Sequence, residues 1–103
     1  MQIQNFIDGQ MVAPLSKQWL DDVEPATGAT YASVPDSGDE DVAAAVQAAA
    51  RAFPAWSRTP AEERCRVLLD LATRLEARLD EFARAESVDT GKPISLARAM
   101  DIP

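Results

Sequence analysis

The chain has no histidine and a single cysteine, Cys65, among its 103 residues. One cysteine cannot form an internal disulfide, and without histidine or a second cysteine it cannot complete the usual kind of zinc site. The absence of histidine also removes the base that most often activates a thiol nucleophile. Because Cys65 falls on the apolar side of an expected helix, we predict a small hydrophobic core residue there, with no catalytic role.

Glycine is also scarce, and its spacing excludes the common phosphate-binding loops. The four glycines are at least ten residues apart. Neither the G-x-G-x-x-G turn of dinucleotide-binding folds nor a Walker loop can be built on such a spacing. We therefore expect no catalytic and no cofactor-binding residue within this chain. The glycines are Gly9, Gly28, Gly38 and Gly91.

Basic residues are too few for a nucleic-acid-binding protein. The chain has 10 Lys and Arg against 17 Asp and Glu, which gives a formal net charge of -7. It therefore lacks the basic stripe that phosphates require, and an anionic membrane surface would repel it. No apolar run approaches the roughly 18 residues of a membrane span, and the amino terminus lacks the features of a signal peptide. We expect a cytoplasmic protein without nucleic-acid or membrane partners.

The composition that remains, 47% hydrophobic and 26% charged, is that of a globular domain. Residues 1–36 predict two β-hairpins. The dipeptide Asp8-Gly9 tolerates positive φ at both turn positions, which favours a tight first hairpin. In the second hairpin, Pro25 presets the first turn angle and Gly28 accepts the left-handed one. The expected strands are residues 5–7, 11–12, 19–23 and 29–34.

Residues 37–103 predict helices. Ser37-Gly38-Asp39-Glu40 and Thr59-Pro60-Ala61-Glu62 both have the form of a capping box, in which a hydroxyl and a glutamate satisfy free amides at a helix start. Pro54 should end the first helix because it has no amide hydrogen. The second helix should run unbroken to Gly91, which supplies a left-handed cap, and the start of a third helix follows.

Apolar residues recur along the second helix at steps of three and four, which predicts one stripe over about 40 Å of helix at 1.5 Å per residue. We expect this stripe to pack within the molecule against Val42, Val46 and Phe53 of the first helix. A partner-binding or coiled-coil face is the alternative, although the run covers only about three heptads. The stripe consists of Cys65, Leu68, Ala72, Leu75, Leu79 and Phe82. Ion pairs expected on the polar side are Glu62–Arg66, Asp70–Arg74 and Asp80–Arg84.

Glu86 and Asp89 fall in the last turns of the expected helix, where free carbonyls already carry partial negative charge. A positive group should therefore lie close to these carboxylates. Lys92 or Arg84 could supply it, and so could a bound cation coordinated by oxygen atoms.

Five segments occur in an order and spacing typical of one enzyme family. They are Asn5-Phe6-Ile7-Asp8-Gly9, Pro25-Ala26-Thr27-Gly28, the stretch from Ala43 to Trp56, Glu62-Glu63-Arg64 and Asp89-Thr90-Gly91-Lys92-Pro93. Together they resemble the amino-terminal segment of NAD(P)-dependent aldehyde dehydrogenases, and the resemblance covers essentially the whole chain. Residues 34–38 and 96–103 are most similar to the enzymes that oxidise 2-aminomuconic or 2-hydroxymuconic semialdehyde.

The resemblance implies an α/β parent fold with a Rossmann-like NAD-binding domain. This chain would be the incomplete amino-terminal α+β segment of that domain, with two β-hairpins in 1–36, then two long amphipathic helices and the start of a third in 37–103. In the family a cysteine thiolate attacks the aldehyde, NAD accepts hydride and a glutamate-activated water releases the acid. Those residues lie beyond position 103 in the family, so we expect the chain alone to be inactive. The complete enzyme would use NAD, with NADP less favoured, act on an aldehyde, and form a homodimer or homotetramer.

The resemblance also implies a structural potassium or sodium site. Many family members build it from the carbonyls of the two residues before an Asn-Pro turn and from the aspartate of the D-x-G-K segment. The corresponding residues are Asp22, Val23 and Asp89. Glu24 replaces the usual asparagine, which adds a carboxylate and leaves the identity of the ion open. The alternative to an enzyme segment is a free-standing scaffold or partner-binding module without enzymatic activity.

Overall fold

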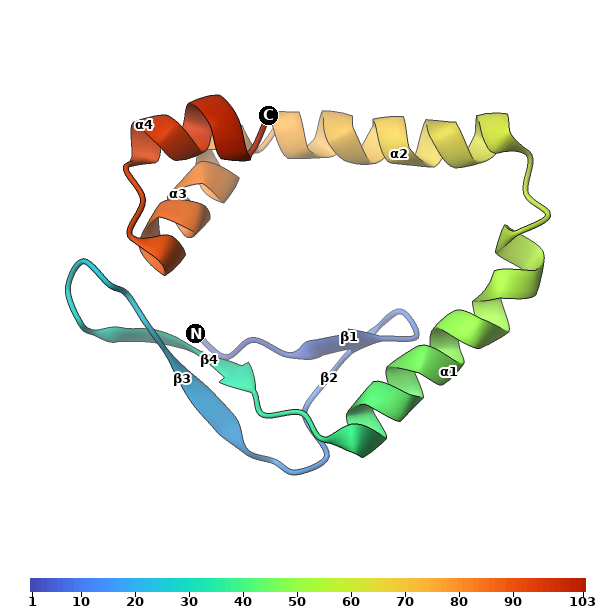
Figure 1. Ribbon diagram of the computed structural model, residues 1–103, viewed down its shortest axis with the longest axis horizontal. Coiled ribbons are helices and arrows are strands. Elements are labelled where there is room, and N and C mark those ends of the chain that lie inside the picture. The colour runs from blue at the N-terminus through green and yellow to red at the C-terminus, as the bar shows by residue number, and fades with distance from the viewer. The chain divides into compact units, whose positions relative to one another are not determined.

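The computed structural model describes residues 1–103, and its elements follow in the predicted order of two hairpins and then helices (Figure 1). The strands are β1 (Asn5–Ile7), β2 (Gln10–Val12), β3 (Trp19–Val23) and β4 (Thr30–Pro35). The helices are α1 (Asp39–Trp56), α2 (Ala61–Glu76), α3 (Leu79–Thr90), α4 (Ile94–Leu96) and the π-helix η1 (Ala97–Asp101). No helix combines the length and the apolar character that crossing a bilayer requires.

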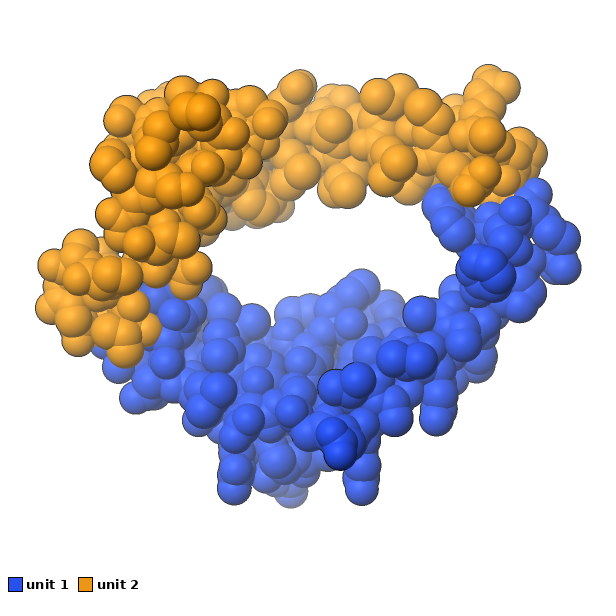
Figure 2. All heavy atoms as spheres, viewed as in Figure 1, with its two compact units in different colours: residues 1–22, 30–58 blue, residues 23–29, 59–103 orange.

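The chain divides into two compact units (Figure 2). Unit 1 consists of residues 1–22 and 30–58, and unit 2 of residues 23–29 and 59–103. Helix α1 therefore belongs with the strands. The tip of the second hairpin, in contrast, belongs with the later helices.

The first predicted hairpin is present. Strands β1 and β2 pair antiparallel, with Phe6 opposite Met11. Asp8 has φ of 53° and Gly9 has φ of 77°, so both turn residues are left-handed, as a two-residue turn of this kind requires.

The second hairpin, between β3 and β4, is also present. The amide of Glu24 donates to the carbonyl of Ala29 at 3.0 Å, and Gly28, with φ of 71°, donates to the carbonyl of Glu24 at 2.8 Å. The amino-terminal residues add to the far edge of β4. There the amide of Ser33 donates to the Met1 carbonyl at 2.9 Å, and the amide of Ile3 donates to the Ser33 carbonyl at 2.8 Å.

The start of α1 differs from the predicted capping box. Gly38 is the residue that precedes the helix, and the carboxylate that reaches back is that of Asp41, whose Oδ2 accepts from the Gly38 amide at 3.1 Å. Glu40 is exposed and does not make the predicted bond. The Ser37 hydroxyl instead pairs with the Asn5 side chain, accepting from Nδ2 at 2.8 Å. Competition from Asn5, 32 residues away in the sequence, explains why the local pattern was misleading.

Pro54 does not end α1, contrary to the prediction. It lies inside the helix, which continues to Trp56. The amide of Ser57 still donates to the carbonyl of Phe53 at 2.8 Å. A proline this close to the end removes only one helical donor, so the turn that follows it can close.

The start of α2 is shifted by one residue from the predicted capping box. Pro60, with φ of -51° and ψ of 143°, is the residue before the helix, and its carbonyl accepts from the amide of Arg64 at 3.1 Å. Proline thus precedes the first helical residue, Ala61. It does not occupy the first helical position that the pattern predicted.

The predicted long helix is two helices. Arg78, with φ of -121° and ψ of 23°, separates α2 from α3. The guanidinium of Arg78 forms a fork on the carboxylate of Glu81, with Nε 2.9 Å from Oε2, and lies 5.4 Å from the ring centroid of Phe82. Ala77 and Arg78 both favour helix, so nothing in the local sequence predicts this interruption.

Small side chains form the buried core of each unit. Ala32 is buried in unit 1 together with the Pro14 side chain, and Ala83 and Ala97 are fully buried in unit 2. Alanine allows close backbone approach, and α3 lies against η1.

The apolar stripe is not buried as predicted. No residue of α2 is buried, Cys65 is exposed, and Leu68 is 64% exposed. The residues expected to cover the stripe, Val42, Val46 and Phe53, are also exposed. Burial of Cys65 and Leu68 was therefore a wrong prediction for this chain, whereas Leu75, Leu79 and Phe82 of the stripe are half-buried. Periodicity reports that a helix has an apolar face but does not identify what covers it.

Candidate functional site

The carboxyl end of α3 is the most highly connected polar region of unit 2. Gly91 has φ of 73°, and its amide donates to the Ser87 carbonyl at 3.0 Å, which confirms the predicted left-handed cap. The Thr90 hydroxyl donates to the Glu86 carbonyl at 2.8 Å and accepts from the Lys92 amide at 3.3 Å. Pro93 then precedes α4, so the segment from Thr90 to Pro93 ends α3 and leads into the next helix.

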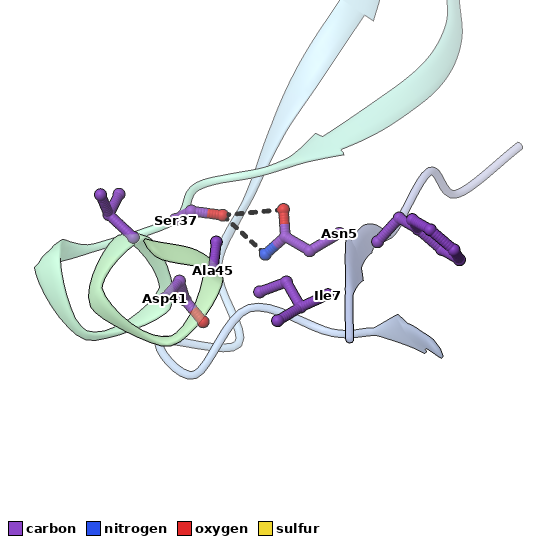
Figure 3. A pocket seen from close by; sticks show the side chains of 7 residues that line it. Asn5, Ile7, Ser37, Asp41 and Ala45 are labelled. Atoms are coloured by element: carbon purple, nitrogen blue, oxygen red, sulfur yellow. Dashed lines mark hydrogen bonds between the residues drawn. The ribbon is translucent and has the colours of Figure 1, made fainter. Parts of the chain in front are cut away.

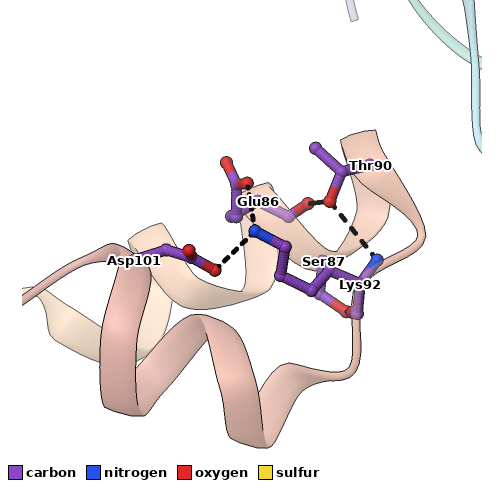
Figure 4. Close-up of polar contacts among 5 residues, drawn as sticks. All are labelled: Glu86, Ser87, Thr90, Lys92 and Asp101. Carbon is purple, nitrogen blue, oxygen red and sulfur yellow. Dashed lines mark hydrogen bonds and ion pairs between the residues drawn. The ribbon is translucent and has the colours of Figure 1, made fainter.

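Lys92 supplies the positive charge expected beside Glu86. Its Nζ lies 2.8 Å from Oδ2 of Asp101 and 3.7 Å from Oε1 of Glu86 (Figure 4). The hydrogen bond to Asp101, followed by the charges of both carboxylates, raises the pKa of Lys92 above its usual range despite the opposing effect of partial burial. The sequence named Lys92 but missed Asp101, which lies nine positions away on another element.

The predicted cation ligands lie at two places along the chain. Asp22 belongs to β3 in unit 1, and its Oδ2 accepts from the Tyr31 hydroxyl at 2.8 Å. Val23, the last residue of β3, and Asp89, near the end of α3, both belong to unit 2. No group of three or more Cys, Asp or Glu side chains is arranged to hold a metal ion.

Within unit 2, the tip of the second hairpin lies against the end of α3. A β-carbon placed on Gly91 would be only 3.3 Å from Cβ of Pro25. The segment that carries Val23 is thus close to the loop that follows Asp89. Glu24, the departure from the family pattern, directs its carboxylate into its own turn, where Oε2 accepts from the Thr27 hydroxyl at 2.8 Å.

Unit 1 has a small pocket of about 180 Å³ between β1 and the start of α1. Asn5 and Ser37 face each other across its rim and share two hydrogen bonds, while Ile7 and Ala45 contribute apolar walls (Figure 3). Its polar groups already have partners, and no buried side-chain nitrogen or oxygen in the structure lacks one. The pocket therefore has no buried polar side-chain atom whose hydrogen bonding a ligand would have to complete.

Cys65 has no catalytic surroundings. It is exposed on α2, which corrects the predicted burial, and the chain contains no histidine to serve as its base. The prediction that Cys65 has no catalytic role rested on its expected burial as well as on the missing base, so the missing base is the argument that remains.

A model of the aldehyde dehydrogenase family matches residues 11–103. The chain belongs to this family. It is 50% identical over 103 residues to the 2-aminomuconic semialdehyde dehydrogenase of Homo sapiens, covering 100% of this chain and 21% of that protein. It is 44% identical over 103 residues to the 2-hydroxymuconic semialdehyde dehydrogenase of Pseudomonas sp. strain CF600, with 99% of this chain and 21% of that protein covered.

Solved structures contain the same fold as this chain. The crystal structure of PnpE in complex with nicotinamide adenine dinucleotide superposes with a TM-score of 0.96 at 44% identity, covering 100% of this chain and 21% of that one. The crystal structure of PnpE from Pseudomonas sp. WBC-3 also gives a TM-score of 0.96 at 44% identity, with the same coverage. The chain spans about a fifth of the length of these relatives.

Proposed function

We propose that this chain is the amino-terminal part of the NAD-binding domain of an aldehyde dehydrogenase that oxidises a muconic semialdehyde to the carboxylic acid. The observation that carries this proposal is identity of 50% and 44%, over 103 residues, to two relatives named for muconic semialdehydes. A nicotinamide complex of a 44% identical relative supports NAD as the cofactor. The same match argues against a free-standing scaffold module.

In this proposal the chain contributes structure and no reacting group. NAD would supply the hydride acceptor when bound, and the catalytic cysteine and glutamate expected from the resemblance would lie outside these residues. The role of residues 1–103 is then to present apolar helix faces and a well-defined turn at the end of α3 to the rest of such an enzyme.

The experiment that tests the proposal begins with the DNA that follows codon 103. We expect it to encode a nucleophile-cysteine segment and a glycine-rich turn after a strand. The complete product should oxidise 2-hydroxymuconic semialdehyde with a higher kcat/KM than acetaldehyde. It should also use NAD, which it reduces to NADH, with a higher kcat/KM than NADP, which it would reduce to NADPH. Equal efficiency with both aldehydes would reject the substrate class, and a downstream sequence without these segments would favour the scaffold alternative.

We also propose that Val23, Asp89 and Asp22 contribute oxygen atoms to a potassium or sodium site in the complete protein. The closeness of Pro25 to Gly91 supports this proposal, because the segments bearing Val23 and Asp89 lie near each other in unit 2. A cation would offset the negative end of α3, and hard cations prefer oxygen ligands.

Substitution Asp89→Asn in the complete product tests the cation site. We expect the gain in Tm on adding potassium or sodium chloride to shrink, while KM for the aldehyde stays nearly unchanged. Choline chloride at equal ionic strength controls for screening, and Asp21→Asn, an exposed neighbour in β3, controls for lost charge. A Tm gain that is the same in the Asp89→Asn variant as in the parent would exclude Asp89 as a ligand.

The same resemblance leads us to propose a cytoplasmic homodimer or homotetramer for the complete product. Light scattering after gel filtration would measure the number of subunits, and cell fractionation would measure the location. A monomer, or a product in the membrane fraction, would contradict these two proposals separately.

A further inference from the structure

Three ion pairs, grouped at two places, connect η1 to α3 in unit 2. At one end, Nη2 of Arg98 lies 2.8 Å from Oδ1 of Asp80, which corrects the predicted Asp80–Arg84 pair. At the other end, Lys92 bridges Asp101, the last residue of η1, and Glu86 of α3. The first pair is largely exposed, with side-chain exposures of 53% and 74%, whereas the Lys92 and Asp101 side chains are 32% and 29% exposed.

The backbone of Lys92 is held by hydrogen bonds to two residues of α3. The Ser87 hydroxyl donates to the Lys92 carbonyl at 2.7 Å, and the Lys92 amide donates to the Thr90 hydroxyl at 3.3 Å. The backbone on both sides of this side chain is therefore tied to α3. An ion pair between preordered and partly buried groups contributes more than a flexible surface pair.

The turn that Lys92 holds has π geometry. The amide of Ile102 donates to the Ala97 carbonyl, five residues earlier, at 3.2 Å. A π turn contains one residue more than an α turn and is uncommon in proteins. The fully buried Ala83 and Ala97 allow α3 and η1 to approach closely, so the end of η1 at Asp101 is close enough for Lys92 to reach.

We propose that Lys92 is a positioning residue that clamps the π turn of η1 onto the end of α3 and thereby directs the chain at Ile102 and Pro103. The proposal explains the lysine of the Asp-Thr-Gly-Lys-Pro segment by a structural role that goes beyond the proposed function and does not depend on it. In that segment, Thr90 and Gly91 end α3, and Pro93 precedes α4. The side chain of Lys92 joins α3 to η1 through Glu86 and Asp101.

Limited trypsin digestion of the complete product tests this clamp. Cleavage after Arg98 requires release of η1, whereas cleavage after Arg84 requires opening of α3 in the same molecule. The ratio of the two rates separates local release from global unfolding, because slow cleavage follows the population of the open form. We expect Lys92→Met to raise the Arg98-to-Arg84 ratio about 10-fold, and Asp101→Asn to do nearly the same.

Matched variants identify the role of charge and distance. Lys92→Arg should restore the parent ratio, and Glu86→Gln should change it less than Asp101→Asn, because the Glu86 contact is longer. Arg74→Met, which removes an exposed pair of 3.1 Å with Asp70 in α2, should leave the ratio unchanged.

Four outcomes would each overturn the proposal. The first is an unchanged ratio in the Lys92→Met variant, and the second is an equal rise in cleavage at both sites. The third is a Lys92→Arg variant whose Arg98-to-Arg84 cleavage ratio equals that of the Lys92→Met variant. The last is cleavage of the parent chain at Arg98 as fast as that of a free peptide of residues 94–103.

Discussion

Asp41 is the one buried charged residue of the chain, with an exposure of 5%. Its carboxylate accepts from the Leu15 amide at 3.1 Å and from the Gly38 amide at 3.1 Å. It therefore joins the loop after the first hairpin to the start of α1. A carboxylate near a helix amino terminus is also favoured by the helix dipole.

The first prediction concerns Asp41→Asn. The amide side chain keeps one acceptor, so one of the two backbone donors loses its partner, at a cost of about 1–3 kcal/mol. Hydrogen exchange of the Leu15 or Gly38 amide should accelerate about 5- to 150-fold, measured by NMR. Asp39→Asn, an exposed change in the same turn, should accelerate either amide by less than a factor of about 5, since only the dipole interaction weakens. Equal effects of the two variants would show that the Asp41 bonds are unimportant.

The second prediction concerns the fork between Arg78 and Glu81. The hydrogen bond from Arg78 and then its charge lower the pKa of Glu81 below the usual range. A depressed carboxyl pKa means that the stabilising contribution is present above the unfolded pKa of about 4.3 and is lost as pH falls through the lower folded value. Titration of the Glu81 carboxyl carbon by NMR should show a midpoint below about 4.3, and Arg78→Met should return it towards that value. A midpoint that is the same in both proteins would contradict the fork.

At the scale of elements, glycine positions mark where segments begin and end. Gly91 and Gly28 have nearly equal φ values of 73° and 71°, and both donate backbone hydrogen bonds. They differ in surroundings, because a β-carbon on Gly28 would meet nothing within 4 Å whereas one on Gly91 would meet Pro25 at 3.3 Å. Substitutions at Gly28 and Gly91 therefore distinguish the effect of backbone strain from the effect of a steric contact.

The third prediction uses this pair. Gly28→Ala should lower the local stability by about 1–2 kcal/mol, because alanine disfavours the left-handed backbone conformation. Gly91→Ala should lower the local stability by more than this, because Pro25 must also move. Exchange of the amide at the substituted position measures each loss, and Pro25→Ala should reduce the difference between them. Equal losses of stability in the two variants would mean that the tip of the second hairpin makes no steric contact with the end of α3.

The break between α2 and α3 is the clearest case in which an element departs from its own pattern. The apolar steps of three and four continue through Ala77 and Arg78 without interruption, and neither residue disfavours helix. The predicted pairs Glu62–Arg66 and Asp70–Arg74 are present at 3.9 Å and 3.1 Å, so the periodicity was correct within α2.

At the scale of the whole molecule, large apolar side chains outnumber the places that could bury them. On α2 alone, Val67, Leu68, Leu69 and Leu71 are between 52% and 64% exposed. Large exposed apolar side chains gathered on one element are typical of a surface that another protein segment or a partner covers. This agrees with membership of a family in which the chain spans 21% of a relative's length.

The fourth prediction is that the isolated chain is helical and binds a hydrophobic dye such as ANS. Leu68→Gln together with Leu69→Gln should lower the dye fluorescence while the far-ultraviolet circular dichroism stays unchanged, because both side chains are exposed. A small core of this kind is marginal alone. A sharp cooperative melt of a monodisperse monomer that binds no dye would instead support an independent module.

The fifth prediction is that the isolated chain has no dehydrogenase activity. Mixing it with NAD and a panel of aldehydes should produce no absorbance rise at the NADH band. In the complete product, Cys65→Ala should leave kcat/KM unchanged. Turnover by the isolated chain that disappears in the Cys65→Ala variant would overturn this prediction and our interpretation of Cys65.

The sequence alone determined the features that depend on a few neighbouring residues. The two turns at Asp8-Gly9 and Pro25 to Gly28, the cap at Gly91 and the helical character of most of 39–90 all follow from backbone preferences of single residues and short periodic patterns. The family resemblance was also available at this level, because motif order and spacing are properties of the chain.

The tertiary structure alone decided which distant groups meet. Three pairings depend on the path of the chain between residues that are not neighbours: Asp41 with Leu15, Ser37 with Asn5, and Lys92 with Asp101. Local propensities for such alternatives differ by about 1 kcal/mol or less, so a single tertiary contact is enough to select among them.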